Sequence, residues 1–343
     1  MKFSCDKSIL NSAISTVQKA VSAKSPIPAL EGIMVAVYDN GILQLTAYDL
    51  NISIHYDIDV GPVEHGTVIF PSQKFGDMIR SLPSGTITVE TDNNTLKTSI
   101  SQGNFNFQLM GISPEDYPEL PEVEGADGFE VTYSDFKNLV RQTIFAVAIT
   151  DLKPILTGVL FEHNKEENMI NAVAVDSFRL AMKKAPYADL SGDFSKVVIP
   201  ARPLNELLKI LPDSDEDTIK IRHSNRFVSF EFGTVKMVSR LLEGEFLDYK
   251  AAIPKDYKFR VKVNVHDFED RIRAASVVAN STSLSPIRCN FDFDRILIST
   301  ANVNEKCDSE LLCEPFSEKM VIWFNYKYML AALNATDDSE IMI

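Results

Sequence analysis

One unit of sequence recurs three times along this chain of 343 residues, at a spacing of roughly 130 residues. In its clearest form a short apolar strand runs through a proline into an amphipathic helix, and residues 68–83 match residues 197–212 in this way. Both copies carry apolar residues four, seven, eight and eleven places after the first proline, which is the stripe of one helical face. Residues 321–333 form a weaker third copy. The recurrence predicts repeated modules rather than a single unique core.

Three further landmarks keep nearly the same spacing. They are the segment Pro28–Gly32, with later copies at Pro154–Gly158 and, weakly, at Pro286–Asn290; the strand end Leu45–Asp49, with copies ending at Asp176 and Asn302; and the acidic, aromatic joint Glu115–Pro118, with a copy at Leu247–Lys250. Proline, glycine and acidic residues cluster between the repeated units, as they do in linkers. We therefore expect three modules, at residues 1–122, 127–250 and 256–343.

Each predicted module opens with a short strand, a polar capping residue and a helix. The caps are predicted at Asp6, Ser134 and Asp267. Helices are expected over residues 7–22, 72–82, 134–147, 201–211, 267–279 and 325–334. Many remaining segments alternate apolar and polar residues with the period of two that is typical of strands, as at 228–232. The sequence thus predicts an α+β fold in which each module packs two helices on antiparallel sheets.

The sequence contains no recognisable catalytic constellation. The motifs G-x-G-x-x-G, G-x-x-x-x-G-K-[ST], H-E-x-x-H and G-x-S-x-G do not occur in it. The 5 histidines are scattered, the 4 cysteines include no C-x-x-C pair, and the acidic run at 213–217 is typical of a solvated turn between a helix and a strand. We therefore expect a protein that is not an enzyme and that needs no metal and no cofactor.

The expected location is the cytoplasm, with no membrane partner. The first residues lack the apolar stretch of a secretion signal. No apolar run approaches the ~18 residues that a membrane-spanning helix needs.

The net charge of −14 argues against an evenly basic, DNA-binding surface. The predicted helices, however, hold 11 basic and 6 acidic residues, so that they carry +5 and the rest of the chain carries −19. Such a protein can present a basic helical face to phosphates while its exterior repels DNA. Charged helix faces that are simply solvated are the other explanation, and charge alone does not decide between them.

Together with the triplicated module, three segments of the chain resemble the bacterial beta sliding clamps, the beta subunits of DNA polymerase III. The segments are residues 24–28, 174–180 and 244–249. The resemblance covers residues 1–343 and implies a processivity factor: a head-to-tail homodimer that forms a ring of six modules, with helices inside and sheets outside, around duplex DNA. The DNA-facing residues that it implies are Lys24, Arg80, Thr150, Lys153 and Arg202.

The resemblance also implies an apolar pocket for short linear peptides from the DNA polymerase III alpha subunit, the clamp loader and repair polymerases. Its implied residues are Leu156, Val175, Ser177, Arg179, Leu180, Leu247 and Ala252. At the subunit contact the implied residues are Phe107, Leu109, Val277 and Val278. Each side chain has a plainer explanation as well, as a surface or core residue.

The third module is shorter than the other two. Beyond its second predicted helix, which ends near Leu333, only residues 339–343 are left to form a strand. We expect this module to be truncated at its C-terminus, with the strand Ile341–Ile343 left as an unpaired edge and the peptide pocket half built. The alternative to a clamp is a non-catalytic repeat β protein for adhesion or carbohydrate binding, which would lack the basic helices.

Overall fold

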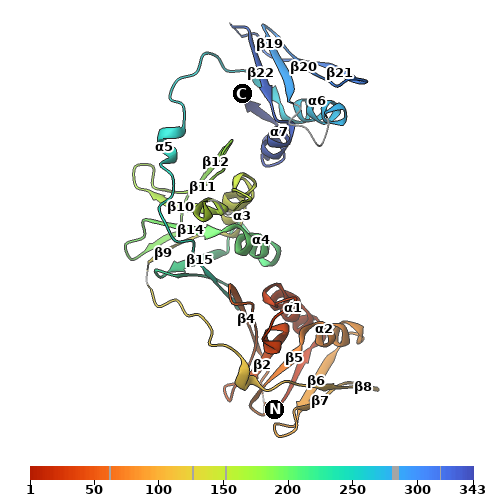
Figure 1. Cartoon of the computed structure of the whole chain (residues 1–343). Coiled ribbons are helices and arrows are strands. Elements are labelled where there is room, and N and C mark those ends of the chain that lie inside the picture. The colour runs from red at the N-terminus through yellow and green to blue at the C-terminus, as the bar shows by residue number, and fades with distance from the viewer. Residues whose placement is uncertain (62, 126, 151–152, 280–285, 317) are drawn as a thin grey trace. The chain divides into compact units, whose positions relative to one another are not determined.

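The computed structural model describes residues 1–343 except 62, 126, 151–152, 280–285 and 317. The fold is α+β, and the chain separates into two compact units. The first consists of Met1–Lys137, Leu160–Asn171 and Lys184–Gly244, and the second of Asn138–Val159, Ala172–Lys183 and Glu245–Ile343. Figure 1 shows the elements along the chain.

The first part of the chain holds two helices beside antiparallel strands. The strands are β1 (Lys2–Asp6), β2 (Gly32–Val37), β3 (Ile42–Tyr48), β4 (Ile52–Asp59), β5 (Gly66–Pro71), β6 (Thr86–Thr91), β7 (Lys97–Gln102) and β8 (Phe105–Met110), and the helices are α1 (Lys7–Val17) and α2 (Ser72–Ser81). The predicted cap is confirmed, because Asp6 accepts a hydrogen bond from the backbone of Ser8 at 2.7 Å. Figure 1 shows α1 and α2 side by side, and their buried faces include Ile14 and Phe75.

The middle part of the chain repeats this composition. Its strands are β9 (Gly128–Thr132), β10 (Gly158–Asn164), β11 (Met169–Val175), β12 (Leu180–Ala185), β13 (Asp189–Ser191), β14 (Lys196–Pro200), β15 (Thr218–His223), β16 (Phe227–Phe232) and β17 (Val235–Arg240), and its helices are α3 (Tyr133–Arg141), α4 (Ala201–Ile210) and the short α5 (Tyr249–Ala252). The predicted cap Ser134 is wrong. Thr132 is the cap instead, since its Oγ1 accepts from the Asp135 backbone at 3.1 Å and donates to the Asp135 carboxylate at 3.0 Å.

The last part of the chain has fewer strands. They are β18 (Lys262–Asn264), β19 (Ile287–Asp292), β20 (Arg295–Ala301), β21 (Lys306–Leu312), β22 (Met320–Phe324) and β23 (Glu340–Met342), with helices α6 (Val265–Val278) and α7 (Tyr326–Leu333). The predicted cap Asp267 is also wrong, because its backbone donates at 3.1 Å to Asn264, which is the actual cap. Phe268 and Ile272 of α6 pack into a core with Phe291 and Leu333.

Short 3-10 helices follow or precede several of these elements. They are η1 (Gln18–Ala20), η2 (Pro28–Glu31), η3 (Pro114–Asp116), η4 (Ile144–Ala146) and η5 (Pro154–Thr157). Two of the prolines that mark the repeat thus begin the same structure, η2 before β2 and η5 before β10. Pro286 stands directly before β19, so the weak third copy of this landmark does not share its structure.

Nine strands of the first unit form one continuous sheet, in the order β13-β9-β15-β16-β17-β4-β3-β2-β5. The antiparallel pair β17 and β4 joins residues about 180 positions apart in sequence, with Met237 opposite Ile54. Both side chains are fully buried. The other sheets run in the orders β1-β6-β7-β8, β12-β11-β10-β14, β21-β20-β19-β22 and β18-β23.

The segment Ile341–Ile343 was expected to form an unpaired strand, and this expectation is wrong because one side of the strand is paired. β23 pairs antiparallel with β18, and Val263 lies opposite Ile341. The backbones of Val261 and Ile343 also exchange two hydrogen bonds of 2.9 Å. Ile341 and Ile343 pack against the core of the last part, and this burial explains the pairing because it removes apolar surface from water.

Candidate functional site

One type of turn recurs at three places, each between two neighbouring strands. In each turn a side-chain oxygen accepts two backbone N–H groups, two and three residues further on: Asp49 those of Asn51 and Ile52 at 3.0 and 2.8 Å, Asp176 those of Phe178 and Arg179 at 2.7 and 2.9 Å, and Asn302 those of Asn304 and Glu305 at 2.9 and 2.8 Å. Short side chains of this kind stabilise turns by replacing a backbone acceptor. These turns contain several of the predicted site residues or contact them.

The turn at Asp49 is tied to Arg202, one of the predicted DNA-facing residues. The guanidinium group of Arg202, on the first turn of α4, forms an ion pair with the Asp49 carboxylate. The Asp49 side chain is only 5% exposed, whereas Arg202 remains more than half exposed. Because a guanidinium group has five N–H donors, this pairing leaves donors of Arg202 free for another anion.

The other predicted DNA-facing residues are all exposed. Lys24 lies in a loop that is ordered by a 3.0 Å hydrogen bond from the Ser25 backbone to Glu31. Arg80 lies in the last turn of α2 and pairs with Asp77 at 2.6 Å. Thr150 and Lys153 flank residues 151–152, which lie outside the described part of the chain. Lys24, Arg80 and Arg202 belong to the first unit, and Thr150 and Lys153 belong to the second.

The turn at Asp176 organises the predicted peptide site, within the second unit. Arg179 donates from Nε to Asp176 at 3.0 Å, and its guanidinium carbon lies 4.4 Å from the ring centre of Tyr328 and 5.5 Å from that of Phe145. The ring of Phe178, which is 79% exposed, lies 5.9 Å from the Tyr328 ring. The ion pair with Asp176 and the cation–π contacts with both rings together restrict the position of the guanidinium group.

Sequence reasoning missed both aromatic partners of Arg179. No spacing links positions 145, 179 and 328, which come from three distant segments, so no local pattern indicated this cluster. The only signal was the pair of tyrosines that opens α7, Tyr326 and Tyr328.

The six other residues predicted for the peptide site lie at three places. Val175 is buried at the end of β11, Ser177 is exposed in the turn, and Leu180 is half-buried at the start of β12. Leu156, also half-buried, lies in η5, and its carbonyl accepts from the Ala148 backbone at 2.9 Å. Leu247, two residues before α5, and Ala252, the last residue of α5, are both exposed. Together with Arg179, the turn and its flanking residues thus hold four of the seven predicted residues, while Leu156 lies in η5 and a separate pair lies at or just before α5.

The residues predicted for the subunit contact lie at exposed edges. β8 is the last strand of its sheet, where Phe105 is 51% exposed, Phe107 half-buried and Leu109 buried. At the end of α6, Val277 is 82% exposed. Val278 is half-buried, and its carbonyl accepts from Asn302 Nδ2 at 3.1 Å. An exposed edge strand that carries apolar side chains is a ready site for strand pairing.

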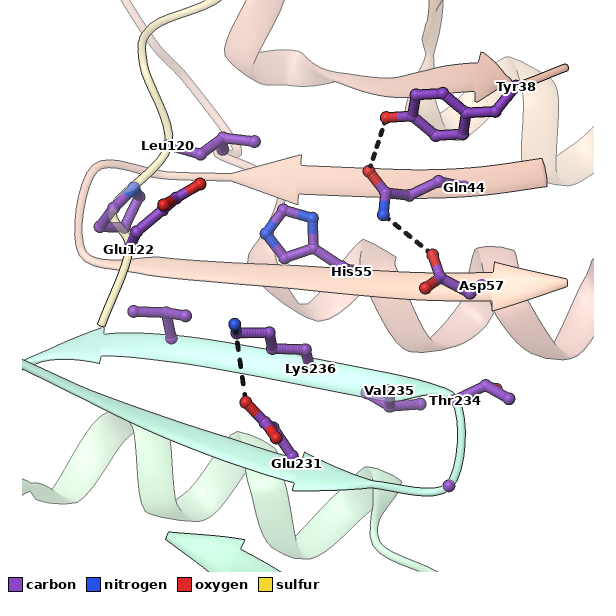
Figure 2. A pocket seen from close by; sticks show the side chains of 13 residues that line it. Tyr38, Gln44, His55, Asp57, Leu120, Glu122, Glu231, Thr234, Val235 and Lys236 are labelled. Atoms are coloured by element: carbon purple, nitrogen blue, oxygen red, sulfur yellow. Dashed lines mark hydrogen bonds and ion pairs between the residues drawn. The ribbon is translucent and has the colours of Figure 1, made fainter. Parts of the chain in front are cut away.

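A hollow of about 610 Å³ lies on the first unit beside the pair β4 and β17 (Figure 2). Gln44 donates to Asp57 at 2.9 Å and accepts from Tyr38 at 3.3 Å, and Lys236 pairs with Glu231 at 3.5 Å. Burial lowers the pKa of His55, and Lys236 lowers it further, against the opposing effects of Asp57 and Glu122. Because most of these polar groups already pair with one another, the hollow offers few free groups to a ligand.

Two searches of the described residues gave negative results. No group of three or more histidine, cysteine, aspartate or glutamate side chains is placed to hold a metal ion within the described ranges. None of the helices that the structure describes is long and apolar enough to cross a membrane.

Comparison with known proteins gives the same family over the whole chain. Family models of the DNA polymerase III beta subunit match this chain in three parts. The model of the N-terminal domain matches residues 1–121, that of the central domain residues 130–248, and that of the C-terminal domain residues 250–343. Beta sliding clamps of Staphylococcus epidermidis and Staphylococcus aureus are 32% identical to it, over 100% of this chain and 92% of theirs.

Solved structures agree with this result. The sliding clamp of Bacillus subtilis has a TM-score of 0.93 at 32% identity, and a beta subunit from Eubacterium rectale has a TM-score of 0.92 at 28% identity, each over 100% of this chain and 92% of the other. The chain therefore belongs to the bacterial DNA polymerase III beta-subunit family, whose members are non-catalytic sliding clamps of DNA replication.

Proposed function

We propose that two copies of this chain join head to tail into a ring of six modules, at residues 1–122, 127–250 and 256–343 of each copy, around duplex DNA in the cytoplasm. Family membership supports a clamp and replaces the alternative of a repeat protein for adhesion or carbohydrate binding. A closed ring holds DNA by topology, so its contacts with phosphates stay weak enough for sliding.

The observation that carries this proposal is the strand pair β17 and β4, whose strands come from the first and the second of the proposed modules. β17 follows a turn at Gly233 (φ 53°), and β8 follows a turn at Gly103 (φ 52°). β4 follows the turn at Asp49, and β21 follows the matching turn at Asn302. Both β8 and β21 are the last strands of their sheets. We infer that β8 of one copy pairs with β21 of the other as β17 pairs with β4.

This correspondence fixes a register for the proposed seam. Met237, four residues after Gly233, lies opposite Ile54, five residues after Asp49. The same counts from Gly103 and Asn302 give Phe107 in one copy opposite Cys307 in the other. Met237 and Ile54 are fully buried, whereas Phe107 and Cys307 are each only half-buried in the single chain, as expected of a pair whose partner is missing.

A disulfide cross-link tests this register. Opposite residues of an antiparallel pair have Cα atoms about 4.5–5.5 Å apart, which suits a disulfide. We expect Phe107→Cys to form a covalent dimer with the natural Cys307 under mild oxidation, on non-reducing gels. Asn106→Cys, whose side chain points to the opposite face, is the matched control. Adding Cys307→Ser to Phe107→Cys should abolish the covalent dimer. The register is contradicted if the double variant still cross-links, or if Asn106→Cys cross-links as well as Phe107→Cys does.

For DNA, we propose that Lys24, Arg80, Thr150, Lys153 and Arg202 approach phosphates in the ring. Their exposure supports this role. Arg202 and Arg80 already pair with Asp49 and Asp77, whereas Lys24 and Lys153 form no ion pair within the described residues, so we expect the two lysines to contribute more to the attraction of DNA.

For partner proteins, we propose that the Asp176–Arg179 turn forms one wall of a site for short linear motifs of the polymerase III alpha subunit, the clamp loader and repair polymerases. The fixed guanidinium of Arg179 and the exposed ring of Phe178 offer a polar anchor beside an apolar surface. A fluorescent clamp-binding peptide should bind Arg179→Ala more weakly than Arg179→Lys, which keeps the charge, and equal affinity for the two variants and the unmodified protein contradicts this assignment.

A further inference from the structure

The carboxylate of Asp49 uses its two oxygens for two different tasks. Oδ1 accepts the backbone N–H groups of Asn51 and Ile52, at 3.0 and 2.8 Å, and so builds the turn between β3 and β4. Oδ2 forms the ion pair with Arg202 of α4. The first task needs only a hydrogen-bond acceptor, whereas the second task needs a negative charge.

The matching turn at Asn302 shows that the first task does not require a charge. The amide oxygen of Asn302 accepts from the backbones of Asn304 and Glu305 at 2.9 and 2.8 Å, which is the pattern of the Asp49 turn without a carboxylate. The side chain of Asp49 is only 5% exposed, and a charge at such a position is costly to bury unless a cation pairs with it. The negative charge of Asp49 is therefore explained by Arg202 and not by the turn.

The charge is not needed to hold the turn against β17 either. Arg240, the last residue of β17, donates from Nε to the Leu50 carbonyl and from its backbone to the Asn51 carbonyl, each at 3.2 Å. Leu50 has a φ of 73°, in the left-handed region that bulky side chains rarely adopt, and these hydrogen bonds help to hold it there. The turn thus keeps contacts with β17 that do not depend on the charge of Asp49.

Arg202 stands where its own helix gains nothing from a positive charge. It is the second residue of α4, and the N-terminal end of a helix disfavours cations because of the helix dipole. The first turn of α4 contains no acidic residue, and Pro200 provides no side-chain cap. Within the part of the chain that the structure describes, Asp49 is the only carboxylate that pairs with Arg202. Arg202 is therefore an exposed cation whose charge Asp49 offsets.

We propose that Asp49 is a positioning residue that limits how strongly Arg202 attracts DNA, and so keeps this contact loose enough for the ring to slide. This role rests on the DNA contact of Arg202 proposed above. Two backbone N–H groups fix the Asp49 carboxylate, so it stays beside the guanidinium group and competes with an approaching phosphate for the same donors. Asp77, beside Arg80, is 58% exposed instead, and water screens that pair.

Asp49→Asn tests this role, because the amide keeps the acceptor of the turn and removes the charge. With a fluorescent DNA duplex at salt concentrations of about 50 to 200 mM, we expect Asp49→Asn to bind more tightly than the unmodified protein. The log–log slope of affinity against salt should steepen by about 0.9, so that its affinity falls about 3.5-fold further across this range. Arg202→Gln, which keeps an amide donor for Asp49, should change the slope little in the unmodified protein but lower it by about 0.9 in the Asp49→Asn variant.

Asp39→Asn is the matched control, because it changes the net charge by the same amount. Asp39 is exposed in the turn before β3, whereas Asp49 follows the other end of this strand, roughly 20 Å away. This separation exceeds the screening length of ~10 Å at 0.1 M salt, so Asp39→Asn should leave the slope unchanged.

The role of Asp49 is overturned if Asp49→Asn binds DNA no more tightly than the unmodified protein, or if Asp39→Asn has an equal effect. Lys24→Ala separates this result from a failure of the DNA contacts proposed above. If Lys24→Ala lowers the slope while Asp49→Asn does not raise it, the DNA contacts stand and the role of Asp49 falls. If neither variant changes the slope, both fall.

Discussion

We propose that the strand pair of β17 with β4 inside the chain is equivalent to the pair of β8 with β21 between two copies, the subunit seam. If so, truncating one matched residue in each pair should have different effects on stability and on dimer formation. Ile54 is fully buried opposite Met237 within the chain, so Ile54→Ala should lower the stability of the first unit by about 2–5 kcal/mol. Phe107 is half-buried in the single chain. Phe107→Ala should therefore change the stability of the monomer little, and its cost should fall on the dimer.

The free-energy cost of Phe107→Ala to the dimer follows from the two equivalent seams that the proposed ring contains. Complete burial of a phenylalanine contributes about 1.5–3 kcal/mol relative to exposure, and half-burial already supplies part of this. Two seams break when the dimer separates, so Phe107→Ala should cost at most about 3–6 kcal/mol, and each 1.4 kcal/mol raises the dissociation constant about tenfold.

Sedimentation equilibrium and calorimetry measure the two effects separately. We expect Ile54→Ala to lower the temperature of the transition that belongs to the first unit, with the same dimer dissociation constant. For Phe107→Ala we expect a much larger dimer dissociation constant. The monomer should unfold at an unchanged temperature, measured at protein concentrations below that dissociation constant. Equal effects of both substitutions on both quantities would refute the equivalence of the joint and the seam.

Further predictions concern His55 and DNA. Because the pKa of His55 is lowered in the folded protein, the unfolded chain binds a proton at this residue more readily. The stability that neutral His55 contributes is therefore complete above pH 6.5 and falls as the pH drops below this value. Between pH 7.5 and 5.5 the melting temperature of His55→Gln should fall less than that of the unmodified protein, and an equal or larger fall contradicts the assignment. Replacing Lys24 or Lys153 with alanine should reduce the salt dependence of DNA association, a log–log slope, by about 1 each, whereas Lys319→Ala, which removes a lysine paired with Asp292, should leave the slope unchanged.

The repeat made much of the fold predictable, because patterns of apolar residues decide which segments form strands and helices. Helix starts were predicted less well where several polar residues compete for the cap, as at Thr132 and Ser134 or at Asn264 and Asp267. Each wrongly predicted cap lies inside the first turn of its helix, and nothing in the local sequence ranks two polar candidates that lie within three residues of each other.

Contacts between distant segments were beyond local patterns. The pairing of Met237 with Ile54 and the cation–π contacts of Arg179 with Phe145 and Tyr328 join segments far apart in the sequence, and no spacing between these residues predicts the contacts. The site residues were therefore predicted from family resemblance alone, and the structure gathers only some of them around the Asp176 turn.

The central claim, a ring that encloses DNA, is tested by sealing the seams around DNA of different topology. Phe107→Cys protein is mixed with nicked circular plasmid, oxidised and then denatured in detergent. Two disulfides between two chains make a closed covalent loop, so we predict that the protein stays with the circle after denaturation and is released when a restriction enzyme linearises the plasmid. Equal retention on circular and linear DNA, or none on circles although both seams are cross-linked, would contradict the ring.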